Sequence, residues 1–164
     1  MVKGEAPGGR RVESGACFAA GLCKPATMNC RSILVWAGIL GATGMGLGAG
    51  GAHGLREFLL AHGTANAWET AVRYHLLHAV ALIALGAWVR ADPRSASGPV
   101  GVAWCWVAGT LLFSGSLYGY AIGGPHGLVY VTPLGGLTLL AGWVLLIVAA
   151  LRLKPANESS GPRV

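Results

Sequence analysis

The sequence is short of charged residues. Asp, Glu, Lys and Arg together make up 11% of its 164 residues, against roughly 25% in an ordinary soluble domain. Hydrophobic residues reach 54%. A soluble domain of this size exposes much of its surface and needs polar groups to cover it. The scarcity of charge therefore argues against a soluble enzyme and against a disordered chain, and the length allows one domain or one small helical bundle.

The sequence also lacks a basic stripe, although its formal net charge is +6. Its Lys and Arg residues are scattered singly, without the interleaved aromatic residues that stack on bases, so we expect no nucleic-acid partner. The first 27 residues contain no apolar run before a small-residue cleavage site, and we expect no secretory signal peptide. Residues 1–30 are predicted to form a polar, disordered tail, the alternative being a translation start at Met28.

Close cysteine pairs are missing as well. Cys17, Cys23 and Cys30 are separated by five and six intervening residues, wider than the pairs of a zinc knuckle. Cys105 falls inside an apolar segment, where a cysteine serves as a small packing residue. We therefore expect no metal site formed by the cysteines and no disulfide.

What the sequence does contain is a set of four apolar stretches, each long enough to cross a bilayer as a helix of roughly 20 residues. They cover about residues 33–54, 68–89, 100–122 and 129–151. Backbone amides in lipid must be satisfied within their own segment, so runs of this length form helices and not strands. We predict an all-α membrane protein with four transmembrane helices in a glycine-rich bundle over residues 31–154, and a polar tail at 155–164.

The positive residues indicate the orientation of these helices. Arg56 and Arg73 are the only two near the ends that join the first helix to the second. The loop between the third and fourth helices has none. The opposite ends carry Lys24, Arg31, Arg90, Arg94, Arg152 and Lys154. By the positive-inside rule, both termini are cytoplasmic in a multi-pass protein of the bacterial inner (plasma) membrane.

Glycine is abundant, with 27 residues, and is concentrated in the first apolar segment. Gly46-x-Gly48-x-x-Gly51 matches a dinucleotide-binding fingerprint in form, but no strand precedes it and no βαβ unit surrounds it, so we reject that interpretation. Small residues four apart share one helix face and let a neighbouring helix approach closely. The predicted packing residues are Gly44, Gly48, Gly50, Gly54, Ser114, Gly115, Ser116, Gly135 and Gly136. The pair Thr132-Pro133 predicts the start of the fourth helix, with Thr132 as its N-cap.

Polar side chains gather at the non-cytoplasmic ends of the first two helices. Ionisable groups inside a membrane segment indicate function by default, and Glu69 can pair with Arg73 four residues later. His75 and His78 lie one turn apart. Three uses remain open: a hydrogen-bonded knot between helices, which we favour, a proton or solute pathway, and a metal or haem site. The candidate functional cluster comprises His53, Glu69, Arg73, Tyr74 and His78.

The order of several motifs resembles a known family. They are Gly-Gly-Ala-His-Gly-Leu at 50–55, Trp68-x-Thr-Ala-x-x-Tyr-x-x-x-His-Ala, Leu-Phe-Ser-Gly-Ser-Leu-Tyr at 112–118, Thr-Pro-x-Gly-Gly at 132–136, Ala-Gly-Trp at 141–143 and Arg-Leu-Lys at 152–154. In this order they resemble the small bacterial membrane proteins grouped as domain of unknown function 423, related to eukaryotic transmembrane protein 256. The resemblance implies a four-helix inner-membrane protein and brings no activity or cofactor. The family usually carries Phe in place of Gly50 and often Gln in place of His75, which favours His53, Tyr74 and His78 among the candidates.

The short loops leave no soluble part for catalysis, so we predict a non-enzymatic protein without a cofactor. The leading hypothesis is a packing, scaffold or accessory subunit whose partners are the lipid bilayer and either further copies of itself or a larger membrane complex. The alternative is a small transporter or channel that uses His53 and His78. A third hypothesis is a haem- or quinone-binding redox subunit.

Overall fold

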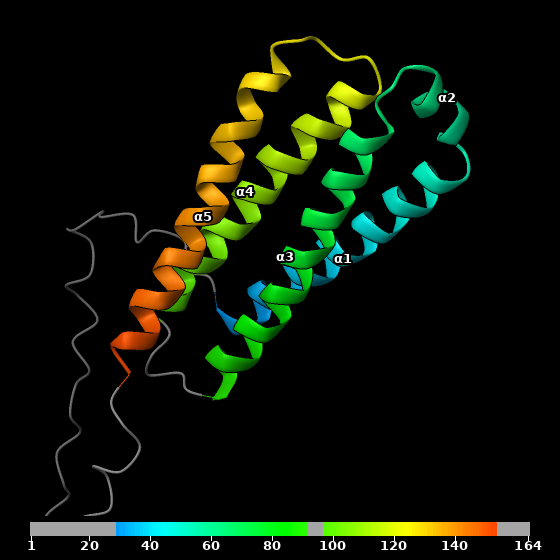
Figure 1. Cartoon of the computed structure of the whole chain (residues 1–164). Helices are drawn as coiled ribbons and strands as arrows, with labels where there is room; N and C mark the ends of the chain where they lie inside the picture. Colours follow the sequence, from blue (N-terminus) through cyan, green and yellow to red (C-terminus); the bar gives the residue numbers. More distant parts are fainter. Residues whose placement is uncertain (1–28, 92–96, 154–164) are drawn as a thin grey trace, which may run out of the picture.

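The computed structural model describes residues 29–91 and 97–153 (Figure 1). The predicted tails at 1–30 and 155–164, and the alternative start at Met28, lie outside this range apart from residues 29 and 30. Every regular element in the described residues is an α-helix. The helices are α1 (Cys30–Ala52), α2 (Arg56–Ala61), α3 (Ala65–Ala91), α4 (Ser97–Ala121) and α5 (Leu128–Leu151).

Four of these helices, α1, α3, α4 and α5, are long and apolar enough to cross a membrane. The predicted all-α membrane class is confirmed. Asn29 caps the start of α1 by accepting a hydrogen bond from the Ser32 amide at 2.9 Å. The sequence did not predict α2, because six residues are too few to produce a recognisable hydrophobic period.

The predicted N-cap role of Thr132 is wrong, although the predicted span of about 129–151 agrees with the helix. The helix α5 begins at Leu128, and Pro133 lies inside it. Proline in that position cannot donate to the carbonyl four residues earlier. The Thr132 hydroxyl does not cap the helix; it bonds the Leu128 carbonyl at 3.3 Å and the Ser116 hydroxyl at 2.8 Å. The Thr132 side chain therefore bonds to α4 and to its own helix, and does not act as the cap that the local sequence pattern predicts.

The spanning helices lie side by side in the order α1, α3, α4 and α5 (Figure 1). The extensive contacts are α1 with α3, α3 with α4, and α4 with α5, so α1 and α5 form the two edges of the row. One core cluster runs through all four helices and includes Ile33, Leu82, Trp106 and Leu139. A smaller cluster ties α2 to the adjacent ends of α3 and α4.

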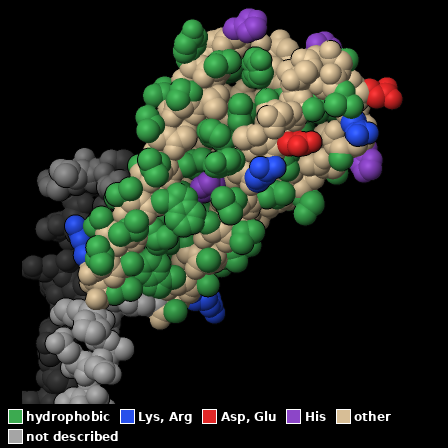
Figure 2. Space-filling model, viewed as in Figure 1, with side chains coloured by type: hydrophobic (Ala, Val, Ile, Leu, Met, Phe, Trp, Pro, Cys, Tyr) green, Lys and Arg blue, Asp and Glu red, His purple; other side chains and the backbone are tan. Residues whose placement is uncertain are grey.

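Apolar and charged side chains are separated along the length of the helices. Figure 2 shows hydrophobic side chains over most of the visible flank and charged groups near the two ends, with one acidic and one basic side chain part-way between. Many large apolar residues are exposed, among them Val80 and Leu137 at 65% and 63%. Such exposure suits a surface that faces lipid, where water does not penalise it.

Candidate functional site

The structure divides the predicted polar cluster into two parts. His53 follows the last residue of α1 and is exposed, as are Glu69, Arg73 and Tyr74. His78 is 1% exposed and lies thirteen residues into α3, about 20 Å along the helix at 1.5 Å per residue. The expectation that His78 lies with the other polar side chains at the non-cytoplasmic ends of the first two helices is therefore wrong.

His78 is held by hydrogen bonds at both ring nitrogens. Its Nδ1 lies 2.8 Å from the Tyr74 carbonyl, which can only accept, so Nδ1 carries the proton. Its Nε2 then accepts from the indole Nε1 of Trp143 on α5 at 3.3 Å. The ring also packs against Trp106 of α4, with centroids 6.0 Å apart. His78 therefore joins three helices and has no free nitrogen for a ligand.

A second chain of hydrogen bonds runs through His75 from α4 to α1. Thr43 donates to the Ile39 carbonyl at 2.8 Å, so its oxygen is free to accept from Nε2 of His75 at 3.3 Å. Nδ1 of His75 then accepts from the Tyr118 hydroxyl, also at 3.3 Å. With the donors and acceptors assigned in this way, each of these side-chain groups has a hydrogen-bond partner and the imidazole of His75 is neutral. Sequence reasoning had paired His75 with His78 on one face but had missed Thr43 and Tyr118, which lie on other helices.

Further side chains reach backbone carbonyls on neighbouring helices. Trp68 donates to the Leu47 carbonyl at 3.0 Å, Ser114 to Ala71 at 2.9 Å, and Thr64 to Ala121 at 2.9 Å. Hydrogen bonds of this kind between membrane helices contribute on average about 0.6 kcal/mol each. Together they fix the register of α1, α3 and α4.

The predicted packing residues differ in what they contact. A Cβ atom at Gly44 would lie 2.8 Å from Leu76, and one at Gly48 would lie 3.2 Å from Val72, so these two positions allow α3 to approach α1. A Cβ atom at Gly135 would meet the backbone of Phe113, and one at Gly136 would make an ordinary contact of 3.6 Å with the ring of Phe113.

Other positions of that prediction are not close contacts. A Cβ at Gly54 would be 3.7 Å from the Gly50 carbonyl, and nothing lies within 4 Å at Gly50 or Gly115. The packing prediction is therefore wrong for Gly50 and Gly115 within this chain. It missed Gly51, where the ring of Trp68 occupies the place of a side chain, with Cδ1 2.5 Å from the Cβ position.

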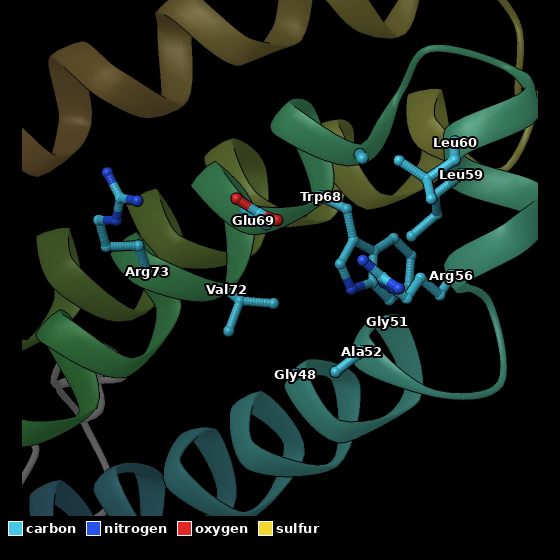
Figure 3. A pocket seen from close by; sticks show the side chains of 11 residues that line it. Gly48, Gly51, Ala52, Arg56, Leu59, Leu60, Trp68, Glu69, Val72 and Arg73 are labelled. Atoms are coloured by element: carbon cyan, nitrogen blue, oxygen red, sulfur yellow. The ribbon is translucent and has the colours of Figure 1, made fainter.

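Two of the exposed cluster residues, Glu69 and Arg73, border a pocket of about 460 Å³ between α1, α2 and the first half of α3 (Figure 3). Most of the residues in its walls are apolar or glycine. Its charged lining residues are Arg56, Glu69 and Arg73, all exposed. Figure 3 shows the Glu69 carboxylate and the Arg73 guanidinium as separate groups, so the predicted pairing of these two residues is not formed.

A second, smaller cavity of about 300 Å³ lies between α3, α4 and α5. It is almost wholly apolar and is lined in part by Trp88, Trp106 and Trp143. Within the described residues, no three His, Cys, Asp or Glu side chains lie close enough together to hold a metal ion.

Comparison with known proteins places the chain in a family. Residues 47–136 match the family model described as "Protein of unknown function (DUF423)". The chain is 40% identical over 109 residues to the UPF0382 membrane protein YwdK of Bacillus subtilis, covering 66% of this chain and 86% of the relative. It is 36% identical over 138 residues to the UPF0382 inner membrane protein YgdD of Escherichia coli K12, covering 80% and 98%. No solved structure matches. The family match and these identities show that the chain belongs to the DUF423 family of membrane proteins.

Proposed function

We propose that this membrane protein is a non-enzymatic packing or accessory subunit that associates with a second copy of itself through the outward face of α1. The observation that carries the proposal is the pair of small-residue faces on that helix. One face, with Gly44 and Gly48, packs on α3. The opposite face carries Gly38, Ala42 and Gly46, all exposed.

The spacing of these three residues suits a helix interface in lipid. They are four residues apart, so they form one stripe on a helix surface. Nothing lies within 4 Å of a Cβ atom built at Gly38 or Gly46. Small residues at this spacing let two backbones approach closely, which is how membrane helices gain van der Waals contact.

A second copy is the partner that fits this stripe best. Two identical stripes can cross each other about a two-fold axis, so the same patch serves both subunits. Since α1 is an edge of the helix row, its outward face is reachable without disturbing contacts of α3, α4 or α5. The two copies then share one orientation in the membrane.

We expect Gly46→Leu to weaken this association, because a leucine side chain there holds the two backbones apart. Energy transfer between donor- and acceptor-labelled copies in liposomes measures it, and we expect the dissociation constant to rise by about tenfold or more, equivalent to about 1.4 kcal/mol. Ala108→Leu, which also introduces a leucine at an exposed position of a spanning helix, here α4, serves as the control and should leave the transfer unchanged.

Equal energy transfer in wild type and Gly46→Leu would contradict the proposal. So would the absence of transfer above that of a non-interacting membrane protein at the same protein-to-lipid ratio. Recovery of a different membrane protein that depends on Gly46 would replace the second copy by that partner.

The positions of the histidines give less support to transport and to haem binding than to packing. A transporter or channel that uses His53 and His78 needs these side chains along one path, but they lie in separate parts of the molecule. A haem ligand at His78 needs a free ring nitrogen, and both of its nitrogens have protein partners. The geometry therefore favours the packing role for His78.

We also propose that both termini are cytoplasmic. Three arginines lie at the same end of the spanning helices: Arg31 near the start of α1, Arg90 near the end of α3 and Arg152 after α5. This supports that side of the bundle as the cytoplasmic one. A green fluorescent protein fused to the C-terminus should fluoresce, and an alkaline phosphatase fused there should be inactive. The reverse pattern would overturn the orientation.

A further inference from the structure

We infer that a groove between the start of α1 and the end of α3 binds an anionic phospholipid, with Arg31 and Arg90 supplying the positive charge. The groove has a volume of about 630 Å³ and is lined by Asn29, Cys30, Arg31, Leu34, Val35 and Arg90. It lies at the opposite end of the spanning helices from α2 (Figure 1). The inference does not rest on the association proposed for the outward face of α1.

The packing of α1 against α3 fixes how the two sides of the groove are aligned. The two helices run in opposite directions (Figure 1). A Cβ atom at Gly44 of α1 would contact Leu76 of α3, and a Cβ atom at Gly86 of α3 would contact Leu34 of α1. Between these two contacts the chain moves ten residues back along α1 and ten residues forward along α3. One turn of α1 therefore lies beside one turn of α3 throughout this interface.

One further turn in the same register brings the two arginines to the same level. Arg90 follows Gly86 by four residues, and Cys30 precedes Leu34 by four. The Cys30 thiol donates to the Gly86 carbonyl at 3.4 Å, so the helices are still in contact at this end. Because Arg31 is the residue after Cys30, the backbones of Arg31 and Arg90 differ in level by only about 1.5 Å, the rise of one residue.

The groove is positively charged. Both arginine side chains are exposed, and none of the described residues that line the groove is acidic. The acids that the structure describes, Glu57 and Glu69, lie in α2 and in the first two turns of α3, toward the other end of the bundle. Basic grooves between spanning helices suit the headgroups of anionic lipids.

The apolar part of the groove favours a lipid over a free phosphate. Leu34 and Val35 are 39% and 52% exposed, and they lie one turn further into the spanning part of α1 than Arg31. An acyl chain that extends from a headgroup at the arginines can therefore contact this apolar surface. Arginine N–H groups bind phosphate oxygens well, and arginines at helix ends lie at the level of the headgroups.

The charge of the groove also distinguishes between phospholipids. Phosphatidylglycerol carries one net negative charge, whereas phosphatidylethanolamine adds an ammonium group to the same phosphate. That ammonium group would lie near two guanidinium groups, with no carboxylate among the described lining residues to bind it. We therefore expect phosphatidylglycerol to bind more tightly.

Native mass spectrometry of the full chain in mild detergent tests the inference. Dioleoyl phosphatidylglycerol and dioleoyl phosphatidylethanolamine are titrated separately, and the lipid-bound fraction gives a dissociation constant for each. We expect Arg31→Gln and Arg90→Gln each to raise the dissociation constant of phosphatidylglycerol about fivefold, equivalent to about 1 kcal/mol per basic residue at a membrane surface. The double variant should raise it about 25-fold if the two effects add.

Arg152→Gln is the matched control. It removes the same charge from the same end of the bundle, at an exposed arginine after α5 that does not line the groove, and it should bind phosphatidylglycerol as wild type does. Arg31→Lys and Arg90→Lys keep the charge and should keep most of the binding, which separates loss of charge from loss of fold. Inorganic phosphate and glycerophosphoglycerol, which lack acyl chains, should fail to displace the lipid.

Equal binding of phosphatidylglycerol by wild type and the double variant overturns the inference, and so does equal binding of the two lipids by wild type. An equal loss in Arg152→Gln would show unspecific attraction to net charge, and displacement by inorganic phosphate would show a site for free anions; either result also overturns it. Gly46→Leu changes a residue fifteen positions from Arg31 and should bind the lipid normally. Failure of the lipid site and failure of the α1 association are therefore distinguishable.

Discussion

Gly135→Ala is expected to lower the free energy of unfolding by about 2–3 kcal/mol, the upper part of the range for an overpacked interior. The added Cβ would lie 2.7 Å from Cα of Phe113 and 2.9 Å from the carbonyl carbon of Leu112. These are backbone atoms of α4, so no side-chain rotation relieves the contact. The helix α5 must move away from α4, and the remaining contacts of that interface loosen with it.

The neighbouring residue provides the matched control. A Cβ at Gly136 would lie 3.6 Å from the ring of Phe113, an ordinary contact. Alanine in the interior of a helix is more favourable than glycine by roughly 0.5–1 kcal/mol. Gly136→Ala is therefore expected to be neutral or slightly stabilising, although the two substitutions are chemically identical and adjacent.

Unfolding by sodium dodecyl sulphate in mixed micelles, followed by tryptophan fluorescence, measures both variants. Trp106 and Trp143, two of the six tryptophans, lie at the α4–α5 interface with ring centroids 4.8 Å apart, so separation of these helices contributes to the change in emission. Equal transition midpoints for Gly135→Ala and Gly136→Ala would show that the close approach at Gly135 is not maintained in the protein.

The four spanning helices could be predicted from the sequence because long apolar runs leave the backbone no other way to satisfy its hydrogen bonds in lipid. Whether a given glycine faces a neighbouring helix could not be predicted. Gly44 and Gly46 both read as small residues in one glycine-rich segment, yet Gly44 faces Leu76 of α3 and Gly46 faces open space. Which face meets a neighbour is decided by the order of the helices in the row, and periodicity alone does not contain that order.

The candidate site shows the same division between local and long-range information. The residues around Arg73 could be identified as a group because ionisable side chains are rare in membrane segments. Their separation from His78 could not be predicted, since the direction in which a side chain of α3 points changes within a few residues. The partners of His75 and His78, Tyr118 and Trp143, lie 43 and 65 residues away in the sequence, and no short pattern links them.

His78→Ala is expected to destabilise the protein by about 2–4 kcal/mol, within the range for deleting a large buried side chain. The ring is 1% exposed and packs against both Trp106 and Trp143, whose centroids are 6.0 and 6.2 Å away. Its removal leaves a cavity and takes the acceptor from the Trp143 indole. Hydrogen bonds between membrane helices are worth about 0.6 kcal/mol on average, so the lost packing supplies most of the cost.

A double-mutant cycle with Trp143→Phe separates these two contributions. That change removes the indole N–H and keeps an aromatic ring, so the coupling between the two substitutions estimates the hydrogen bond, expected at about 0.5–1.5 kcal/mol. His53→Ala is the control: its exposed position after α1 predicts a change within about 0.5 kcal/mol.

The pair of histidine variants also decides between a structural and a transport role for this part of the molecule. If His78 acts by holding α5 against α3, His78→Ala lowers the unfolding midpoint and His53→Ala does not. A solute pathway that uses both histidines makes the opposite demand, that each substitution abolish flux in liposomes while His78→Ala leaves the midpoint unchanged. The burial of His78 and the occupation of both its nitrogens favour the first outcome, because a side chain with no free donor or acceptor can hold helices together but cannot bind a passing solute.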